Sequence, residues 1–581
     1  GLAKEANIYF EFSTNEKVAM EVAATAAASG LRSFTFMKHV GMNVASDSFM
    51  TTAYSGVNGG MVILSADDPS LFSSQNEQDT RNYGHLANVP ILEPSNCQEV
   101  KDMVKYAFDL SEQFKLPVIV RTTTRVSHMR GVVEFGEAAD NSSEGETHWK
   151  KGFFKKNPAQ FVPVPAFAKD MHVALVEKMD EINKITNESD FNVESDFSQN
   201  KKYGVIASSS AYNYAYDVIR YNNLDIDVLK LGFSYPFPYD KVADFVKDYD
   251  EVFIVEEVDP IIEKDTLVAI GKNNLNTVVH GKLDGTFPVY HEFNSDIVAN
   301  GFNKYLNFIE ENTDDYSDNL LNLQEEIPSR APVLCAGCPH RAMYYGVNKA
   351  LEELGIPLKD AVFASDIGCY TLGINPPYNA ADYLLSMGSS VGDGCGFSIA
   401  TNQKVISFIG DSTFFHSGIS PLINAVHNKN NFILTVLDNR ITAMTGGQPN
   451  PGIPVDGMGD DAPEISIRKL ALACGCNYVR VINPLNLDQV VKTYKEALER
   501  DEVCVIIAKA PCTLIKGKTR KPPVNYIDSN CNGCNKCVSE LACPAISKDG
   551  GKIAIDPSMC DGCGVCIQVC KYGALEAGRG E

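Results

Sequence analysis

The sequence contains no apolar run long enough to span a bilayer, no signal peptide at its beginning and no low-complexity tract. It is also short of positive charge: 51 Lys and Arg residues against 74 Asp and Glu residues give a formal net charge of −23. A chain this acidic is repelled by nucleic acids and by anionic lipid surfaces. We therefore expect a cytoplasmic protein that has neither nucleic acid nor membrane as a partner.

A disulfide framework is also not expected. The odd total of 17 cysteines and the lack of a secretion signal argue for a reducing compartment. A hydrophobic content of 44% and a charged content of 22% are typical of globular proteins, and 581 residues suffice for about three or four domains. The chain begins at Gly1 instead of Met and reaches a strand-like segment within ten residues, so we expect that further residues precede it.

Short buried strands alternate with helical segments along most of the chain, which predicts an α/β fold with several parallel sheets. Residues 34–36, 61–64 and 118–120 are typical of such strands, and polar, turn-rich segments separate the larger regions. The expected regions are a first α/β domain at 1–135, a linker with some helix at 136–200, a second α/β domain at 201–325, a third at 326–516, and a cysteine-rich tail at 517–581.

The tail carries two cysteine groups with the spacing of bacterial ferredoxins, in which three close cysteines bind one 4Fe-4S cluster and a fourth binds the other. This arrangement predicts a small α+β domain with two cluster sites in the tail. The alternative is a pair of zinc sites. The predicted ligand sets are Cys531, Cys534, Cys537 and Cys570 for one cluster, and Cys560, Cys563, Cys566 and Cys543 for the other.

Residues 404–439 form a predicted strand–helix–strand unit. Its first strand ends at Gly410-Asp411 and its second at Asp438-Asn439. Because parallel strands present their carboxyl ends at one sheet edge, Asp411 and Asn439 should lie side by side as oxygen ligands for Mg²⁺ and a diphosphate. Two ordinary loop residues, a capping Asp and a turn Asn, are the alternative. Gly392-Asp393-Gly394 follows no buried strand and is not expected to form such a site.

These residues carry a resemblance. Gly410-Asp411-Ser412 with Asp438-Asn439 resembles the diphosphate motif of thiamine diphosphate enzymes, and residues 439–448 resemble the 2-oxoacid:ferredoxin oxidoreductases. The likeness covers nearly the whole chain, including residues 15–19, 37–41, 73–79 and the tail. It implies a pyrimidine-binding thiamine domain at 1–135, a transketolase C-terminal-like domain at 201–325, a diphosphate and Mg²⁺ domain at 326–516, and a ferredoxin-like tail.

The resemblance also implies cofactor ligands. Asp411, Asn439 and Ile441 would bind Mg²⁺, and Ser412 replaces the second glycine of the common motif, as a variant of this branch. The residues implied to bind thiamine diphosphate are Gly388, Gly410, Asp411, Ser412, Asn439, Ile441 and Thr445.

Three further residues resemble active-site positions of the family. Glu16 would act on the aminopyrimidine of the cofactor, although Ser13-x-x-Glu16 also reads as a capping box before a helix. Arg125 follows a predicted strand and would grip the 2-oxoacid carboxylate, with a surface salt bridge as the alternative. His39 matches a cleft position, but a lone histidine is more often structural; Asn76 and Asp79 match cleft positions on weaker grounds.

A third 4Fe-4S cluster near the thiamine is implied by four cysteines at family positions. From sequence alone, buried thiols at strand ends are an equally good reading. These cysteines are Cys335, Cys338, Cys369 and Cys512.

The activity implied is that of a large subunit that oxidatively decarboxylates arylpyruvates of the indolepyruvate class to acyl-CoA and CO2 and reduces ferredoxin. Coenzyme A, ferredoxin and a smaller β subunit are the expected partners, in a hetero-oligomer. The alternatives are a non-aryl 2-oxoacid as substrate, a non-oxidative thiamine-dependent decarboxylase or synthase, and, from another class, an electron carrier whose α/β domains bind a partner. The tail cysteines argue against non-oxidative chemistry, which needs no electron exit.

Overall fold

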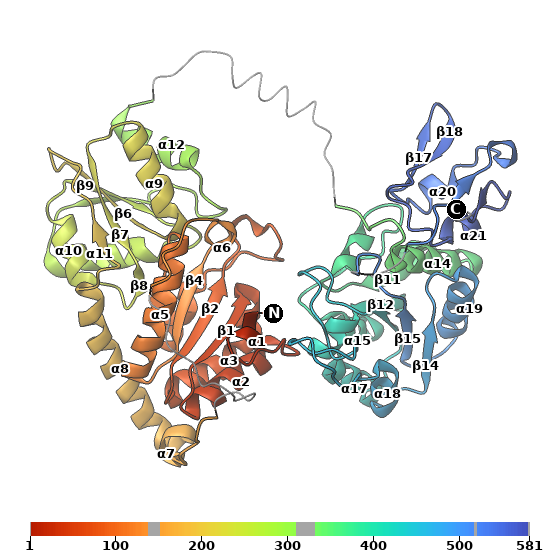
Figure 1. Cartoon of the computed structure of the whole chain (residues 1–581), viewed down its shortest axis with the longest axis horizontal. Coiled ribbons are helices and arrows are strands. Elements are labelled where there is room, and N and C mark those ends of the chain that lie inside the picture. Colours follow the sequence, from red (N-terminus) through yellow and green to blue (C-terminus); the bar gives the residue numbers. More distant parts are fainter. Residues whose placement is uncertain (1, 137–150, 310–331, 516, 518–519, 579–581) are drawn as a thin grey trace. The chain divides into compact units, whose positions relative to one another are not determined.

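The computed structural model describes residues 2–136, 151–309, 332–515, 517 and 520–578 (Figure 1). They fall into two compact units: the N-terminal unit, Asn15–Ser317, and the C-terminal unit, which combines Gly1–Thr14 with Asp318–Glu581. The first helix, α1 (Leu2–Glu5), belongs to the C-terminal unit. Within the described ranges, no helix has the length and apolar character needed to cross a membrane.

The N-terminal unit contains two five-stranded sheets. In the first sheet, four strands are parallel and the last, β8, is antiparallel to its neighbour. The central strand β4 is buried along its whole length and β2 along most of it, and both contain the Val and Ile residues that suit strands covered on both faces. The strands, in spatial order, are β1 (Ser33–Lys38), β2 (Met61–Ala66), β4 (Val118–Thr122), β3 (Ile91–Leu92) and β8 (Phe233–Tyr235).

Helices cover this first sheet and supply the rest of its core. Among them α8 lies in the region expected to be a linker, yet its Leu175, Met179 and Ile182 are buried in the core of the first sheet. Their spacing of four and three residues is that of one helix face. The helices are α2 (Glu16–Ala28), α3 (His39–Ser55), α4 (Arg81–Ala87), α5 (Cys97–Phe114), α6 (Thr124–His128), α7 (Pro158–Phe161) and α8 (Pro165–Asn187).

The second sheet of the N-terminal unit has a parallel centre with one short antiparallel edge strand. The strands, in spatial order, are β10 (Val278–His280), β9 (Glu251–Val255), β6 (Tyr203–Ser208), β7 (Ile226–Leu231) and β5 (Val193–Glu194). The helices are α9 (Ser209–Tyr221), α10 (Tyr239–Val246), α11 (Ile261–Asn273) and α12 (Ser295–Leu306).

Buried ion pairs tie the two sheets of this unit together. The guanidinium of Arg81 is fully buried. It donates to Asp79, which belongs to the part of the unit built on the first sheet, and, over 2.7 Å, to Glu256 beside the second sheet. Breaking such a buried pair leaves an unpaired charge, so these contacts fix the junction firmly.

The C-terminal unit is built on a fully parallel sheet, with β12 and β13 adjacent in its centre. The strands, in spatial order, are β11 (Ala361–Ala364), β12 (Lys404–Gly410), β13 (Ile433–Asp438), β15 (Cys504–Lys509) and β14 (Tyr478–Ile482). The helices are α14 (Pro339–Glu353), α15 (Ser390–Ala400), α16 (Asp411–Thr413), α17 (Ile419–His427), α18 (Ile467–Ala473) and α19 (Leu487–Leu498).

The cysteine-rich tail forms a small subdomain against α14 and α19 (Figure 1). The side chain of Gln568 donates to the carbonyl of Leu485 over 2.8 Å and accepts from the amide of Leu487 over 3.0 Å, which fastens the tail to the start of α19. The short elements of the tail are β16 (Asn525–Tyr526), α20 (Lys536–Ser539), β17 (Ile546–Asp549), β18 (Lys552–Ile555), α21 (Val565–Val569) and β19 (Leu575–Glu576).

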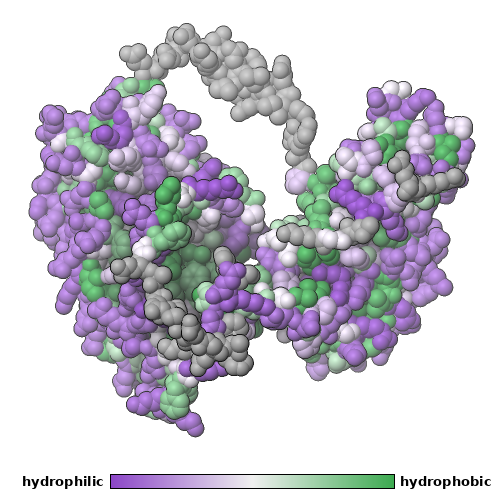
Figure 2. Space-filling model, in the orientation of Figure 1, coloured by the Kyte–Doolittle hydropathy of each residue, from purple (hydrophilic) through white to green (hydrophobic). Residues whose placement is uncertain are grey.

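Hydrophilic residues dominate the face of the protein shown in Figure 2, and the hydrophobic residues on it are scattered. The predicted fold class is confirmed: the chain consists of mostly parallel α/β sheets followed by a small C-terminal α+β region.

Candidate active site and cluster sites

The carboxyl ends of β12 and β13 bring two acidic side chains together. Gly410 pairs with Leu437 in the sheet, so the next residues, Asp411 and Asp438, follow as neighbours. Asp411 accepts hydrogen bonds from the amide of Ser412 over 2.8 Å and from the amide of Arg440 over 2.9 Å. Asp411 is therefore held by the residue that follows it and by the loop that begins at Asp438, and Asp438 is a residue to which the sequence assigned no role of its own.

Both carboxyl groups are held away from water. Burial, and the neighbouring Asp438, raise the pKa of Asp411 to about 7. Burial likewise raises the pKa of Asp438, although Lys509 approaches it to 3.8 Å. Because burial and the negative charge of Asp438 both disfavour the ionised form of Asp411, a cation beside the pair would stabilise that form. The donor set fits a hard divalent cation such as Mg²⁺.

Asn439 joins this edge of the sheet to a cysteine. Its side-chain oxygen accepts from the amide of Ile441 over 3.2 Å, and its carbonyl accepts from the amide of Cys512 over 3.0 Å. Between them, Arg440 has a positive φ of 67°, which turns the chain sharply enough for its amide to reach Asp411. Further along, the hydroxyl of Thr445 donates to Gln448 over 2.8 Å in an exposed turn.

Gly388 lies in a tight loop where no other residue fits. It has a φ of 92°, and a Cβ there would lie 1.7 Å from the hydroxyl oxygen of Ser417. Asp366 holds this loop by accepting from the amides of Gly388 over 2.7 Å and Ser390 over 3.1 Å. Burial raises the pKa of Asp366 to about 6. Sequence reasoning missed Asp366, whose only signal is its position after β11.

As the sequence indicated, Asp393 does not belong to this edge of the sheet. It lies inside α15 and accepts from the hydroxyl of Ser389 over 2.8 Å.

The four cysteines expected near the thiamine approach one another at this end of the sheet. Burial and the neighbouring Cys512 and Cys335 raise the pKa of Cys369, and burial with Cys335 raises that of Cys338 to about 12. The amide of Cys338 donates to the carbonyl of Cys335 over 3.2 Å in the turn before α14. The electrostatic contacts thus link Cys369 to cysteines from two other segments of the chain.

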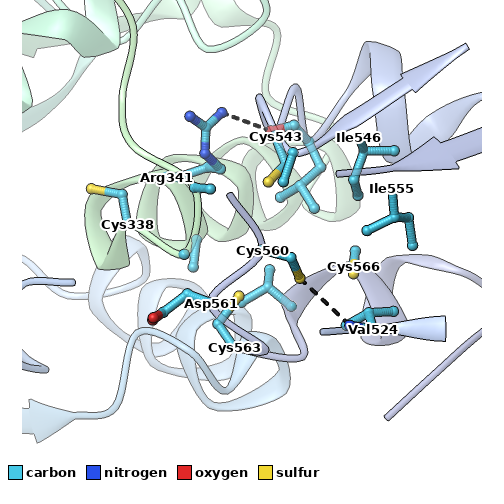
Figure 3. A pocket seen from close by; sticks show the side chains of 16 residues that line it. Cys338, Arg341, Val524, Cys543, Ile546, Ile555, Cys560, Asp561, Cys563 and Cys566 are labelled. Carbon is cyan, nitrogen blue, oxygen red and sulfur yellow. Dashed lines mark hydrogen bonds between the residues drawn. The ribbon is translucent and has the colours of Figure 1, made fainter. Parts of the chain in front are cut away.

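In the tail, the eight cysteines divide into two groups around two separate cavities. One cavity lies between the tail and the start of α14 (Figure 3). The other lies on the side of the tail that holds α20. The tail cysteines that line the first cavity are Cys543, Cys560, Cys563 and Cys566, which share it with Cys338, and those that line the second are Cys531, Cys534, Cys537 and Cys570.

This division matches the two ligand sets that the spacing predicted. Across the described residues, no three His, Cys, Asp or Glu side chains converge on a single-ion site. A single zinc ion needs its donors about 2.0–2.3 Å from one point. Four tail cysteines around each cavity fit the four-thiolate ligand set of a 4Fe-4S cluster.

In the N-terminal unit, Glu16 is the first residue of α2. The predicted capping box is wrong: the cap is Asn15, whose side chain accepts from the amide of Val18 over 2.9 Å, while the hydroxyl of Ser13 donates to Glu11. Glu16 instead extends toward α3, since a Cβ on Gly41 would lie 2.8 Å from its Cγ. Capping therefore does not account for Glu16.

His39 begins α3 and is fully buried. Its Nε2 lies 3.1 Å from the carbonyl of Asn76, and its Nδ1 has no partner in the described part of the chain. Asp79, which the sequence also placed in a cleft, is buried in the ion-pair network with Arg81 and Arg121.

Arg125 lies in α6, just after β4, with a largely exposed side chain. Its Nε donates to Glu292 over 2.9 Å and its Nη2 donates to the other oxygen of the same carboxylate over 2.8 Å. Glu292 is almost buried, with 6% of its side chain exposed, and its amide donates to the hydroxyl of Ser70 over 2.7 Å. The sequence gave no sign of Glu292, because 167 residues separate it from Arg125.

Known families match three parts of the chain. Residues 3–196 match the family described as pyruvate flavodoxin/ferredoxin oxidoreductase, thiamine diphosphate-binding; residues 366–508 match the C-terminal TPP-binding domain of thiamine pyrophosphate enzymes; and residues 523–571 match a 4Fe-4S dicluster domain. Together with the carboxyl pair and the cysteine-lined cavities, they define a thiamine pyrophosphate enzyme that carries iron–sulfur clusters.

Curated relatives narrow this class. Indolepyruvate oxidoreductase subunit IorA of Methanothermobacter marburgensis is 55% identical over 99% of this chain and 91% of its own length. The protein of the same name from Pyrococcus horikoshii is 41% identical over 100% of this chain and 91% of its own. The chain belongs to the family of indolepyruvate oxidoreductase subunit IorA. The predicted family resemblance is thereby confirmed.

Matches outside this family are more distant. The 2-oxoglutarate synthase subunit KorB of Methanocaldococcus jannaschii is 27% identical over 37% of this chain and 82% of its own. A solved 2-oxoglutarate:ferredoxin oxidoreductase from Magnetococcus marinus is 21% identical and covers 32% of this chain and 67% of its own, with a TM-score of 0.29.

Proposed function

We propose that this chain is the large subunit of an enzyme that oxidatively decarboxylates arylpyruvates of the indolepyruvate class to acyl-CoA and CO2 and reduces ferredoxin. One observation carries the proposal: the amide of Cys512 donates to the carbonyl of Asn439, so a cysteine-rich site adjoins the edge that bears Asp411. A decarboxylase without an electron acceptor has no use for cysteines at this place. The names of the curated relatives support indolepyruvate as the substrate class.

In this proposal residues 326–516 bind the diphosphate and Mg²⁺. Asp411 and Asn439 would bind the cation through their side chains and Ile441 through its carbonyl. The negative charge of Asp438 would make the electrostatic potential at this site more favourable for a cation. Gly388, Gly410, Ser412 and Thr445 would line the cofactor site. When bound, thiamine diphosphate supplies a carbanion-stabilising centre for decarboxylation.

The N-terminal unit would supply the groups that act on cofactor and substrate. Residues 1–135 would bind the aminopyrimidine, with Glu16 holding or moving a proton at its N1′ atom. Arg125 would bind the oxoacid carboxylate through the Nη1 edge, because Nε and Nη2 are engaged by Glu292. His39, whose buried Nδ1 has no partner among the described residues, is a further candidate for contact with the substrate.

Electrons would leave through the cysteine sites. We propose two 4Fe-4S clusters in the tail, with the ligand sets given above, and a third held by Cys335, Cys338, Cys369 and Cys512. A smaller β subunit, coenzyme A and ferredoxin complete the proposed system, which would work in the cytoplasm as a hetero-oligomer. The subunit designations of the IorA and KorB relatives support a multi-subunit enzyme.

Steady-state turnover tests the proposal. The chain is co-purified anaerobically with its partner subunit and supplied with thiamine diphosphate, Mg²⁺, coenzyme A and a panel of aryl and aliphatic 2-oxoacids. We expect arylpyruvate-dependent reduction of a viologen dye. The loss of CO2 without dye reduction would favour the non-oxidative alternative, and preference for an aliphatic oxoacid would overturn the substrate class. If the purified protein holds iron but no thiamine, the electron-carrier alternative stands instead.

A further inference from the structure

Arg341 occupies an unusual position for a charged residue. It lies in the first turn of α14, three residues after Cys338, and only 4% of its surface is exposed. Buried arginines are rare unless their charge and donors are used, because removing a guanidinium from water is costly. Within the described ranges, Arg341 forms no ion pair with a carboxylate, and its donors are engaged by neutral acceptors.

The acceptors come from two separate segments of the chain. Nη2 donates to the carbonyl of Leu334 and, over 3.4 Å, to that of Cys335. Nη1 donates to the carbonyls of Leu541, over 3.2 Å, and Ala542. The first segment leads into Cys335 and Cys338, and the second leads into Cys543. One guanidinium therefore holds together the two loops that present these cysteines.

The second loop needs this support. Ala542 has a φ of 47°, a conformation that residues with a side chain rarely adopt. The hydroxyl of Tyr378 also donates to the carbonyl of Leu541, and Nη1 of Arg341 donates to that hydroxyl over 2.9 Å. Arg341 and Tyr378 thus fix the backbone just before Cys543.

The remaining donor of Arg341 is unused. Its Nε is buried and has no hydrogen-bond partner among the described residues. Arg341 lines the first tail cavity together with Cys543, Cys560 and Cys563, and Figure 3 shows it beside Cys543, with its guanidinium bonded to the neighbouring backbone. A buried N–H without a partner at a cavity wall indicates a site for an acceptor.

We propose that Arg341 is a positioning residue for the cluster in this cavity: it holds the Cys543 loop in place and, through its charge and its Nε donor, raises the reduction potential of that cluster. Reduction adds a negative charge, which a nearby buried cation stabilises, and hydrogen bonds to cluster sulfurs act in the same direction. The inference rests on the proposed assignment of Cys543, Cys560, Cys563 and Cys566 to one 4Fe-4S cluster.

Potentiometric titration followed by electron paramagnetic resonance tests this inference on the anaerobically purified full chain with its partner subunit. In Arg341→Met we expect the equilibrium constant for reducing this cluster to fall at least about tenfold, equivalent to about 59 mV for a one-electron couple. Arg520→Met is the matched control. Arg520 approaches Asp561 to 4.0 Å near the same cavity, but its side chain is 57% exposed, so solvent screens its charge. In Arg520→Met the equilibrium constant for reducing the cluster should change by less than about twofold.

The signal of the second tail cluster is identified by its loss in Cys534→Ser. If Arg341→Met loses only the first cluster and keeps the second, the positioning role is supported. Retained iron with an unchanged potential overturns the inference. If Arg341→Met does not fold, Arg341→Lys is tested instead. The ammonium of lysine has three donors and cannot serve both loops, so the equilibrium constant for reducing this cluster should fall about threefold. An unchanged potential again overturns the inference. Absence of 4Fe-4S signals in the unmodified protein would instead refute the proposed function.

Discussion

At the scale of single residues, the most informative group is the carboxyl pair of Asp411 and Asp438. Sequence spacing found Asp411 because it ends a buried strand, and it found the neighbouring strand end. It could not show that Asp438 is the charged residue that acts on Asp411, because strand register is set by packing across the sheet. The pair indicates a use for a cation: neither carboxyl group is solvated, and burial together with the negative charge of Asp438 raises the cost of ionising Asp411.

This arrangement predicts a specific pH dependence. Because the pKa of Asp411 is about 7 in the folded protein and about 3.9 when unfolded, the folded state binds more protons between these values. Stability without Mg²⁺ should therefore fall as the pH rises from about 4 to about 7. Asp411→Asn should be more stable than the unmodified protein at pH 8 by about 4 kcal/mol and equal to it near pH 4.

Urea unfolding of protein freed of Mg²⁺ and thiamine measures this difference. Adding Mg²⁺ should stabilise the unmodified protein more at pH 8 than at pH 6 and should have little effect on Asp411→Asn. Equal pH profiles for the two proteins would contradict the account of the carboxyl pair.

A second residue-scale prediction concerns Glu292. Its carboxylate engages two donors of Arg125, so a bound oxoacid shares the guanidinium with a fixed negative charge. Glu292→Gln should lower the KM for the oxoacid about threefold and leave kcat nearly unchanged, whereas Arg125→Ala should raise KM by about tenfold or more. Steady-state kinetics with one oxoacid decides. An unchanged KM in Arg125→Ala would remove Arg125 from the site, and a raised KM in Glu292→Gln would show that Glu292 orients Arg125 for binding.

At the scale of elements, local rules predicted several of the central strands and misjudged one helix start. The runs at 61–64 and 118–120 became β2 and β4 because continuous Val and Ile suit a strand that is covered on both faces. The start of α2 was misjudged because Ser13 and Asn15 are both good caps, and only the folded backbone decides between them. Helix α8 falls in the region expected to be a linker with some helix, because its buried face is a narrow stripe and its other residues mix charged side chains with the exposed Val173 and Val176.

The cap of α2 gives a matched pair of variants. Asn15→Ala should cost about 1 kcal/mol, because the amide of Val18 loses its acceptor. Ser13→Ala should change stability by less than about 0.5 kcal/mol, since Ser13 only contacts the partly exposed Glu11. Urea unfolding of both variants checks this, and the reverse order of effects would restore the capping box that the sequence suggested.

At the scale of the whole molecule, the sequence predicted which tail cysteines lie around the same cavity, because ferredoxin spacing is local. It could not predict how these sites relate to the rest of the unit. That relation depends on long-range contacts: Asn439 with Cys512, and Arg341 with both the Cys335 loop and the Cys543 loop. Residues such as Asp366 and Glu292 were missed for the same reason, since their partners lie far away in the sequence.

Iron content tests the number of clusters directly. Anaerobically purified chain should contain about twelve irons, three clusters of four. Cys335→Ser should reduce this to about eight and leave the signals of the tail clusters in place. About eight irons in the unmodified protein would remove the third cluster and leave Cys335, Cys338, Cys369 and Cys512 as thiols.

The central claim is that decarboxylation at the Asp411 edge delivers electrons to the iron–sulfur clusters. Anaerobic rapid mixing of indolepyruvate with the enzyme, loaded with thiamine diphosphate and Mg²⁺ and joined to its partner subunit, tests it in one turnover. We predict bleaching of the cluster absorbance in step with CO2 release, and neither event in Asp411→Ala. Release of CO2 from the unmodified enzyme while the clusters stay oxidised would contradict the account.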